Sequence, residues 1–251
     1  MIRTLLIITG ASLVLCIAAL SGAAAIGGND LARNGWEWTF RDADRTETIT
    51  FQRGDDGPAV TRNLAWTGGD RLTVEIPGDV IYVQGDTPSV VVTGQKSMVD
   101  RVSLVNGRLG RDGDDDGRDY VVFGWSNHDR LRVVITAPSV TRFDLESSAD
   151  LSIRNYDQPT FALNVSGSGD VDAAGQTQSA TIEVSGSGDS DLSALRVTDA
   201  RIEVSGSGDL RVAPTGRADI AISGSGDVEL TARPVTVNQN ISGSGDVDLR
   251  N

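Results

Sequence analysis

Apolar and polar residues alternate with a period of two along much of this chain. Arg71–Ile76 and Val80–Gln84 alternate clearly and are separated by Pro77-Gly78-Asp79. A period of two is typical of β-strands that bury one face, whereas long stretches of helical periodicity are absent. The pattern therefore predicts an all-β fold. Further predicted strands, each bounded by Gly, Asp, Asn or Pro, cover residues 89–93, 100–105, 120–123 and 131–136.

From about residue 141 the alternation becomes a repeat. The aspartates that end successive copies of the repeated motif are 18 to 20 residues apart, and a degenerate copy, ESSAD, occupies 146–150. Strand repeats of this length are typical of a solenoid, in which each coil covers the open face of the next. Identical SGSGD sequences occupy residues 166–170, 185–189, 205–209, 223–227 and 242–246.

The phase of each coil follows from the apolar residues around the motif. Ile182 and Val184 precede one copy, and Leu192 follows it. If Val184 points inward, alternation places both glycines inward and both serines and the aspartate outward. We therefore expect the coil to turn at the motif, where a Cβ on either glycine has no room on the inside. With coils ~4.8 Å apart, the outward Ser-Ser-Asp rows form a ladder roughly 20–25 Å long.

The N-terminus is typical of an export signal. Arg3 gives a short positive region, Leu5–Leu20 an apolar region, and Ala23–Ala25 a small-residue cleavage site. The alternative is an uncleaved membrane anchor, because the apolar segment approaches spanning length. Cys16, the single cysteine, lies within the apolar region and not at its end. We interpret it as part of the signal, so that the exported chain has no thiol or disulfide.

These features predict four regions along the chain. Residues 1–25 form the signal peptide, 26–70 a polar linker or cap, 71–140 an N-terminal β-rich part, and 141–251 the solenoid with SGSGD repeats. The predicted location is therefore the periplasm, the outer surface or the extracellular medium, with membrane contact only through an uncleaved signal segment.

Charge narrows the range of partners. The formal net charge is −13, Lys96 is the only lysine, and the arginines are scattered. Such a chain repels nucleic acid and anionic membrane surfaces and lacks a phosphate-binding stripe. We therefore expect no nucleic-acid partner.

The whole arrangement resembles a known family. The segments RLTVEIPGDVIYVQG, VVVTG and LRVVITAPSVTRFDLESSADLSI, followed by serial VSGSGDV and ISGSGDV coils, are similar to the head GIN domain of auto-transporter adhesins. The resemblance runs from about Leu72 to Asn251. It implies a right-handed parallel β-helix-like solenoid in an exported bacterial protein, with a role in adhesion and no catalytic motif. One departure is that no translocator barrel follows the repeats in this sequence.

The aspartate ladder is the main candidate site. Neighbouring carboxylates about 5 Å apart repel one another by ~1 kcal/mol in water, so something offsets that cost. One alternative is that each aspartate accepts hydrogen bonds from a serine hydroxyl or a backbone N–H of its own or the next coil. The other is a surface that binds cations such as Ca²⁺, or glycans. The ladder consists of Asp170, Asp189, Asp209, Asp227 and Asp246, with Asp150 from the degenerate copy.

A second candidate cation site is the loop RDGDDDGRD at 111–119. Asp112, Asp114 and Asp116 have the spacing of the first half of an EF-hand calcium loop. The twelfth position is Phe123, where that loop needs a bidentate glutamate, and no helices flank it. The alternative is a solvated hairpin loop.

Catalysis has little support in the sequence. His128 is the only histidine, and no serine lies in a nucleophile elbow. The sequence thus predicts a non-catalytic envelope or surface module that binds a glycan or another envelope component. The alternatives are a polysaccharide-active enzyme on a β-helix and a periplasmic scaffold that associates end to end through its open coil edge.

Overall fold

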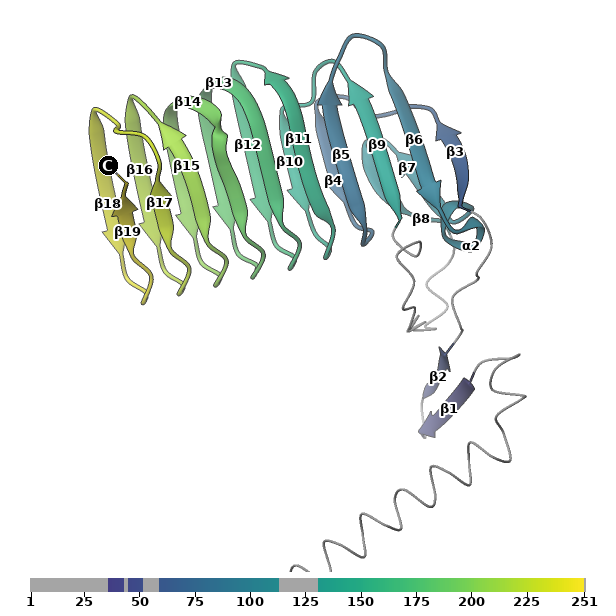
Figure 1. The fold of residues 1–251 in the computed structure, drawn as a ribbon. Helices are drawn as coiled ribbons and strands as arrows, with labels where there is room; N and C mark the ends of the chain where they lie inside the picture. The colour runs from purple at the N-terminus through teal and green to yellow at the C-terminus, as the bar shows by residue number, and fades with distance from the viewer. Residues whose placement is uncertain (1–35, 43–44, 52–58, 113–130, 251) are drawn as a thin grey trace, which may run out of the picture. The chain divides into compact units, whose positions relative to one another are not determined.

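A computed structural model describes residues 36–42, 45–51, 59–112 and 131–250. The chain divides into two compact units. One contains a hairpin of β1 (Trp36–Asp42) and β2 (Arg45–Phe51), paired antiparallel. The other contains the solenoid (Figure 1). Within these residues, no helix has the length and hydropathy to cross a membrane. The predicted signal peptide lies outside the described residues.

The solenoid is built from two columns of parallel strands, which we call sheet A and sheet B. Sheet A holds the strands before each corner: β4 (Arg71–Val74), β10 (Arg142–Leu145), β12 (Thr160–Val165), the second halves of β13 (Val171–Val184) and β14 (Ser190–Val204), β16 (Arg217–Ile222) and β18 (Thr236–Ile241). Sheet B holds those after it: β5 (Asp79–Gln84), β11 (Asp150–Asp157), the first halves of β13 and β14, β15 (Leu210–Pro214), β17 (Val228–Leu230) and β19 (Val247–Leu249). The predicted all-β fold of stacked coils is confirmed.

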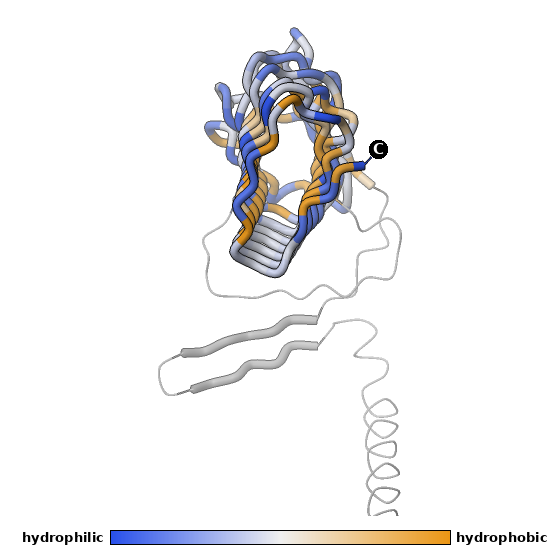
Figure 2. Tube along the Cα trace, turned by 90° about the vertical axis from the view of Figure 1, so that its left-hand side faces the viewer, coloured by the Kyte–Doolittle hydropathy of each residue, from blue (hydrophilic) through white to orange (hydrophobic). Residues whose placement is uncertain are grey.

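The repeat keeps equivalent residues in register from coil to coil. Ile182 pairs with Ile202, which pairs with Ile220, so identical apolar side chains stack in the interior. Viewed along the stack, apolar positions line the inside of the coil and polar positions the outside (Figure 2). This arrangement buries a continuous core although no single coil could bury its own apolar face.

Aromatic residues fill the core of the first coils. Tyr82, Phe143, Tyr156 and Phe161 are fully buried and make edge or tilted ring contacts with centroids 5.1–6.0 Å apart. Burial raises the pKa of the Tyr82 phenol to about 12, so it stays a hydrogen-bond donor. Its hydroxyl donates to the Ala137 carbonyl at 2.9 Å, which satisfies the buried polar group.

At the N-terminal end, stacking order and chain order differ. The chain forms an extra coil from β8 (Arg108–Arg111), which pairs with β4, and β9 (Arg132–Ala137), which pairs with β5. From β9 it continues to β10, on the far side of the β4–β5 coil. The β4–β5 coil is therefore held between two coils that come later in the sequence.

Antiparallel strands cover this end of the stack. β6 (Ser89–Gly94) pairs with β9 and with β3 (Val60–Leu64), and β7 (Val102–Val105) pairs with β8. One short helix, α2 (Lys96–Val99), has Asp100 as its C-cap, so the strand predicted at 100–105 begins only at Val102. Arg62 Nη1 fixes this turn by donating to the carbonyls of Val99, Asp100 and Val102. The strand predicted at 120–123 lies outside the described residues.

The SGSGD corner has the predicted orientation, and a close backbone approach leaves its glycines no room for a Cβ, as predicted. Gly188 is buried and Gly186 half-buried, whereas the serines and Asp189 are exposed. A Cβ on Gly186 would lie 1.9 Å from the Gly167 carbonyl oxygen, and one on Gly188 equally close to that of Gly169. The obstacle is thus the backbone of the preceding coil. None of the motif glycines has a left-handed φ.

This contact predicts a large stability loss for Gly208→Ala, whose Cβ would meet the Gly188 carbonyl oxygen at 2.0 Å. Because that atom belongs to backbone held in the ladder, we expect the free energy of unfolding to fall by at least about 2 kcal/mol. Gly69→Ala is the matched control, since nothing lies within 4 Å of its Cβ position. Urea denaturation of both variants measures the difference, and equal stability would contradict the close-approach account.

Candidate functional site

The aspartates of the motif form a continuous hydrogen-bonded ladder on the corner. The backbone N–H of Asp189 donates to Oδ1 of Asp170 at 2.9 Å, and that of Asp209 donates to Oδ1 of Asp189 at 3.0 Å. The next two steps, Asp227 to Asp209 and Asp246 to Asp227, measure 2.9 and 2.8 Å. Four successive carboxylates therefore each accept a charge-assisted hydrogen bond from the next coil.

The ladder occurs where main-chain pairing changes direction. Up to the aspartate, N–H groups of the corner donate to the preceding coil, as Ser187 does to the Gly167 carbonyl at 3.1 Å. The following residue donates to the next coil, as Ser190 does to the Asp209 carbonyl at 2.8 Å. The aspartate side chain supplies the acceptor for the N–H at this reversal. Its carboxylate thus serves the backbone, which is the first of the two predicted alternatives.

The column of corner aspartates in register begins one coil earlier than the motif suggests. Asp79 is in register with Asp150, although PGD stands there in place of SGSGD. The bond also differs, because the Asp150 N–H donates to the main-chain carbonyl of Gly78 at 2.9 Å. Asp79 is in turn in register with Arg132 on β9 of the extra coil. The position of Asp79 at the start of an alternating segment was the signal that could have revealed it.

A second outward row runs beside the ladder on sheet B. It places Asp172 next to Asp191, followed by Arg211 and Glu229. Sequence reasoning missed this row, although the Asp-x-Asp spacing in copies of the repeat signals it. Residues two apart on a strand share a face, so the two rows together make a carboxylate-rich surface. We call this surface the acidic face; it comprises Asp150, Asp170, Asp172, Asp189, Asp191 and Asp209.

Asp172 and Asp191 are neighbours in the second row, and their pKa values are shifted in opposite directions. Partial burial, and then the carboxylates of Asp191, Asp170 and Asp150, raise the pKa of Asp172 above its ordinary value. In contrast, hydrogen bonds from Ser193, including its backbone N–H at 3.0 Å, lower the pKa of Asp191. Beyond them, Glu229 is held between Arg211 and Arg250, each at 2.9 Å. The repulsion among these carboxylates therefore acts most on Asp172, where Arg154 offsets it only in part.

Neither predicted cation site is tested by the structure. The described residues contain no group of three or more His, Cys, Asp or Glu arranged to hold a metal ion. Calcium binding by the ladder therefore stays a prediction. In the loop at 111–119, the Asp112 N–H donates to the Arg101 carbonyl at 2.6 Å, while Asp114 and Asp116 lie outside the described residues, as does His128.

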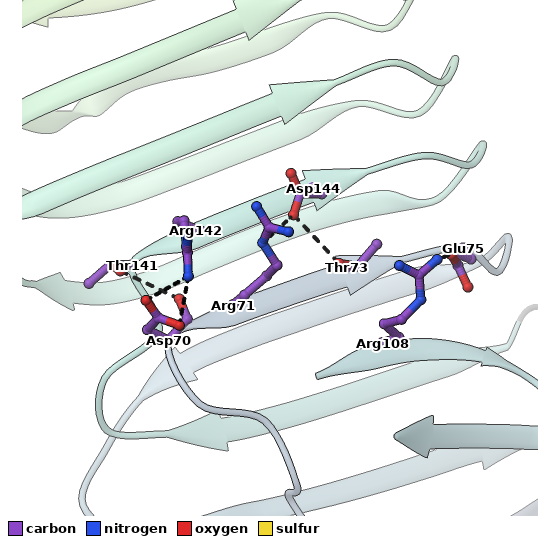
Figure 3. Close-up of polar contacts among 8 residues, drawn as sticks. All are labelled: Asp70, Arg71, Thr73, Glu75, Arg108, Thr141, Arg142 and Asp144. Atoms are coloured by element: carbon purple, nitrogen blue, oxygen red, sulfur yellow. Dashed lines mark hydrogen bonds and ion pairs between the residues drawn. The ribbon is translucent and has the colours of Figure 1, made fainter. Parts of the chain in front are cut away.

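Sheet A carries its charges in pairs across the first coils (Figure 3). Arg142 donates to both carboxylate oxygens of Asp70 at 2.8 and 2.9 Å, and this contact lowers the pKa of Asp70. Arg71 Nε lies 3.2 Å from Asp144 Oδ2, and Arg108 pairs with Glu75. These pairs join β8, β4 and β10. Because each charge has a partner, this surface differs from the acidic face.

Residues 70–234 match the family model described as "Putative auto-transporter adhesin, head GIN domain". The chain belongs to this family. The match covers the extra coil, the β4–β5 coil and most of the SGSGD repeats, which confirms the resemblance seen in the sequence. Among curated proteins, none matches the chain.

Several solved structures are similar to this chain. A "putative adhesin" from Bacteroides fragilis is 16% identical with a TM-score of 0.59, and the match covers 79% of this chain and 100% of that one. A "putative lipid binding protein" from Parabacteroides distasonis is 18% identical with a TM-score of 0.49, covering 80% and 100%. A "putative adhesin" from Parabacteroides merdae is 15% identical with a TM-score of 0.48, covering 80% and 99%. At this identity the likeness concerns the fold alone.

The ladder predicts that Asp209→Ala and Asp209→Asn behave differently. Alanine leaves the Asp227 N–H, now bonded at 2.9 Å, without its acceptor, so we expect a loss of about 1 kcal/mol in the free energy of unfolding. Asparagine keeps Oδ1 as an acceptor and removes a charge from the stack, so its stability should equal or exceed that of the wild type. Chemical denaturation of both variants decides this, and equal losses would show that the charge itself is required.

The second row predicts opposite pH effects for Asp172→Asn and Asp191→Asn. The raised pKa of Asp172 means that its ionisation destabilises the fold, so its asparagine variant should have a higher Tm at pH 7 and an unchanged Tm at pH 3. The lowered pKa of Asp191 stabilises the fold above its ordinary value of 3.8 and loses that effect as pH falls through the folded pKa. Asp191→Asn should therefore lower Tm at pH 7. Thermal melts of both variants at pH 7 and pH 3 measure these effects. A change of Tm in the same direction for both variants at pH 7 would refute the prediction.

Proposed function

We propose that the protein is an exported, non-catalytic binding module of the bacterial cell envelope or surface, with a role in adhesion. Membership of the head GIN family and the shared fold of the Bacteroides fragilis protein support this proposal. The predicted signal peptide supports export. The observation that carries it is the acidic face, a regular polar surface whose geometry is set by backbone hydrogen bonds.

The regularity of this face suits an extended ligand. Coils repeat every ~4.8 Å, so equivalent carboxylates form rows with a fixed spacing. Asp170 and Asp189 each bind the next coil through Oδ1, and a carboxylate has about four acceptor sites. The face therefore keeps acceptor capacity for the hydroxyls of a glycan chain or another envelope component. Because the backbone already orders these side chains, binding loses little conformational entropy.

Calcium would be attracted to the same face, although its described carboxylates form no ready-made metal site. Carboxylate oxygens are the ligands that Ca²⁺ prefers, and a bound cation would remove the repulsion concentrated at Asp172. Such an ion would also bridge the acidic face to hydroxyl groups of a glycan. We therefore expect ligand binding to increase with calcium concentration.

The test is binding of the purified protein to a glycan array and to isolated envelope fractions, in millimolar calcium and in EDTA. We expect binding that calcium strengthens, and its loss in the triple variant Asp170→Asn, Asp189→Asn, Asp209→Asn. Asparagine keeps the Oδ1 acceptors of the ladder, so this variant should remain folded.

The matched control is the double variant Glu183→Gln, Glu203→Gln, which removes exposed carboxylates from sheet A. It should bind as the wild type does. Absence of binding to every glycan and fraction, or equal binding by both sets of variants, would contradict the proposed role of the acidic face. Shortening of a defined polysaccharide by the wild type would instead favour an enzyme.

A further inference from the structure

The last described coil, β18 and β19, differs from those before it. Four large apolar side chains are exposed among the described residues, and three belong to this coil or its entry: Val235 at 87%, Ile241 at 38% and Leu249 at 54%. Residues 232–250 hold two arginines and two aspartates (2 − 2 = 0), so this coil carries no net charge although the whole chain carries −13. An uncharged end on an acidic protein favours contact with a like surface.

The outer edge of β18 carries backbone groups that no described strand pairs. On its inner side, the N–H groups of Thr236 and Ser242 donate to the carbonyls of Gly216, just before β16, and Ile222, at its end, at 3.0 and 2.8 Å. Alternation therefore turns the N–H and C=O groups of Val237, Gln239 and Ile241 toward the open edge. Natural edge strands are commonly protected by charges, proline or bulges. β18, with the sequence TVNQNI, contains no charged residue, proline or glycine.

The sequence of this edge is symmetric about Gln239. One apolar residue stands at each end of the segment Val237–Ile241, and three amides stand between them. We propose that β18 pairs antiparallel with β18 of a second copy, around a two-fold axis through Gln239. Val237 then faces Ile241 of the copy, Asn238 faces Asn240, and Gln239 faces itself. All outward N–H and C=O groups of these odd-numbered residues find partners across the axis.

The amide side chains favour a second copy of this chain as the partner of the open β18 edge. An amide is both donor and acceptor, so two identical amides on a two-fold axis can bond each other. Identical charges in that place would repel. A register shifted by one residue would place Val237 opposite an amide of the copy. Val237 and Ile241 would then no longer cover each other. The symmetric register therefore matches apolar with apolar and amide with amide along the whole segment.

The same two-fold axis accounts for the exposure of Leu249 on sheet B. A two-fold axis normal to the sheets continues sheet A and also brings β19, which carries Leu249, toward β19 of the copy. The contact is isologous and closes at two copies, so it yields a dimer and not a fibre. A dimer would carry two acidic faces, and this inference does not depend on their ligand.

The first test is the mass of the purified protein in sedimentation equilibrium over a concentration series. We expect a monomer–dimer equilibrium in the wild type. Gln239→Lys places two like charges on the axis and should weaken dimerisation at least roughly tenfold. Gln239 is exposed, so the fold should tolerate the change. Thr181→Lys, an exposed position of sheet A in an inner coil, adds the same charge and should leave the dimer unchanged.

The second test does not depend on loss of binding. Directly opposed, hydrogen-bonded residues of an antiparallel pair have Cα atoms about 5.5 Å apart, which a disulfide can bridge. Gln239→Cys should therefore give a covalent dimer on mild oxidation, whereas Thr181→Cys should not. Cys16 is replaced by serine in both proteins. A wild type that stays monomeric at all concentrations, or a dimer that neither Gln239 variant affects, would overturn the proposal. Ligand binding without dimerisation would leave the proposed function standing and reject this interface alone.

Discussion

The close approach of successive backbones at the SGSGD corner is the constraint on which the rest of the solenoid depends. A side chain on either glycine of an inner coil would come within about 2 Å of a carbonyl oxygen of the coil before it. With only glycine present, the corner strands stay in hydrogen-bonding range and the two sheets stack in register. The buried column of Ile182, Ile202 and Ile220 follows from that register.

The stacked aspartates show how one side chain serves both the fold and the surface. Neighbouring carboxylates repel by ~1 kcal/mol in water, while each receives a backbone hydrogen bond of 2.8–3.0 Å from the next coil. The two effects are similar in size, so the ladder costs little and leaves a row of negative charge outside. This balance is why the acidic face can be stable without a bound cation and still gain from one.

Much of the repeat region was predictable because local patterns decide it. Alternation placed the strands, and the phase around Val184 placed the glycines inward and Asp189 outward. The hydrogen bonds of the ladder were one of two alternatives that residue types alone left open. The passage of the chain from β9 to β10 across the β4–β5 coil was not predictable, since it depends on pairing between distant segments. Asp79 was missed because its corner has the sequence PGD, and Asp172 because it lies two residues beyond the SGSGD motif.

The interleaved order of the first three coils has a mechanical consequence. The β4–β5 coil is bonded on both sides to segments that follow it in sequence, so it cannot leave the stack until those neighbours separate. The later coils contact only the coils before and after them and can detach one at a time. Under tension the solenoid should unzip stepwise from its C-terminal end, while the N-terminal end yields as a single block. A protein held at a surface would thereby extend under load before its innermost part fails.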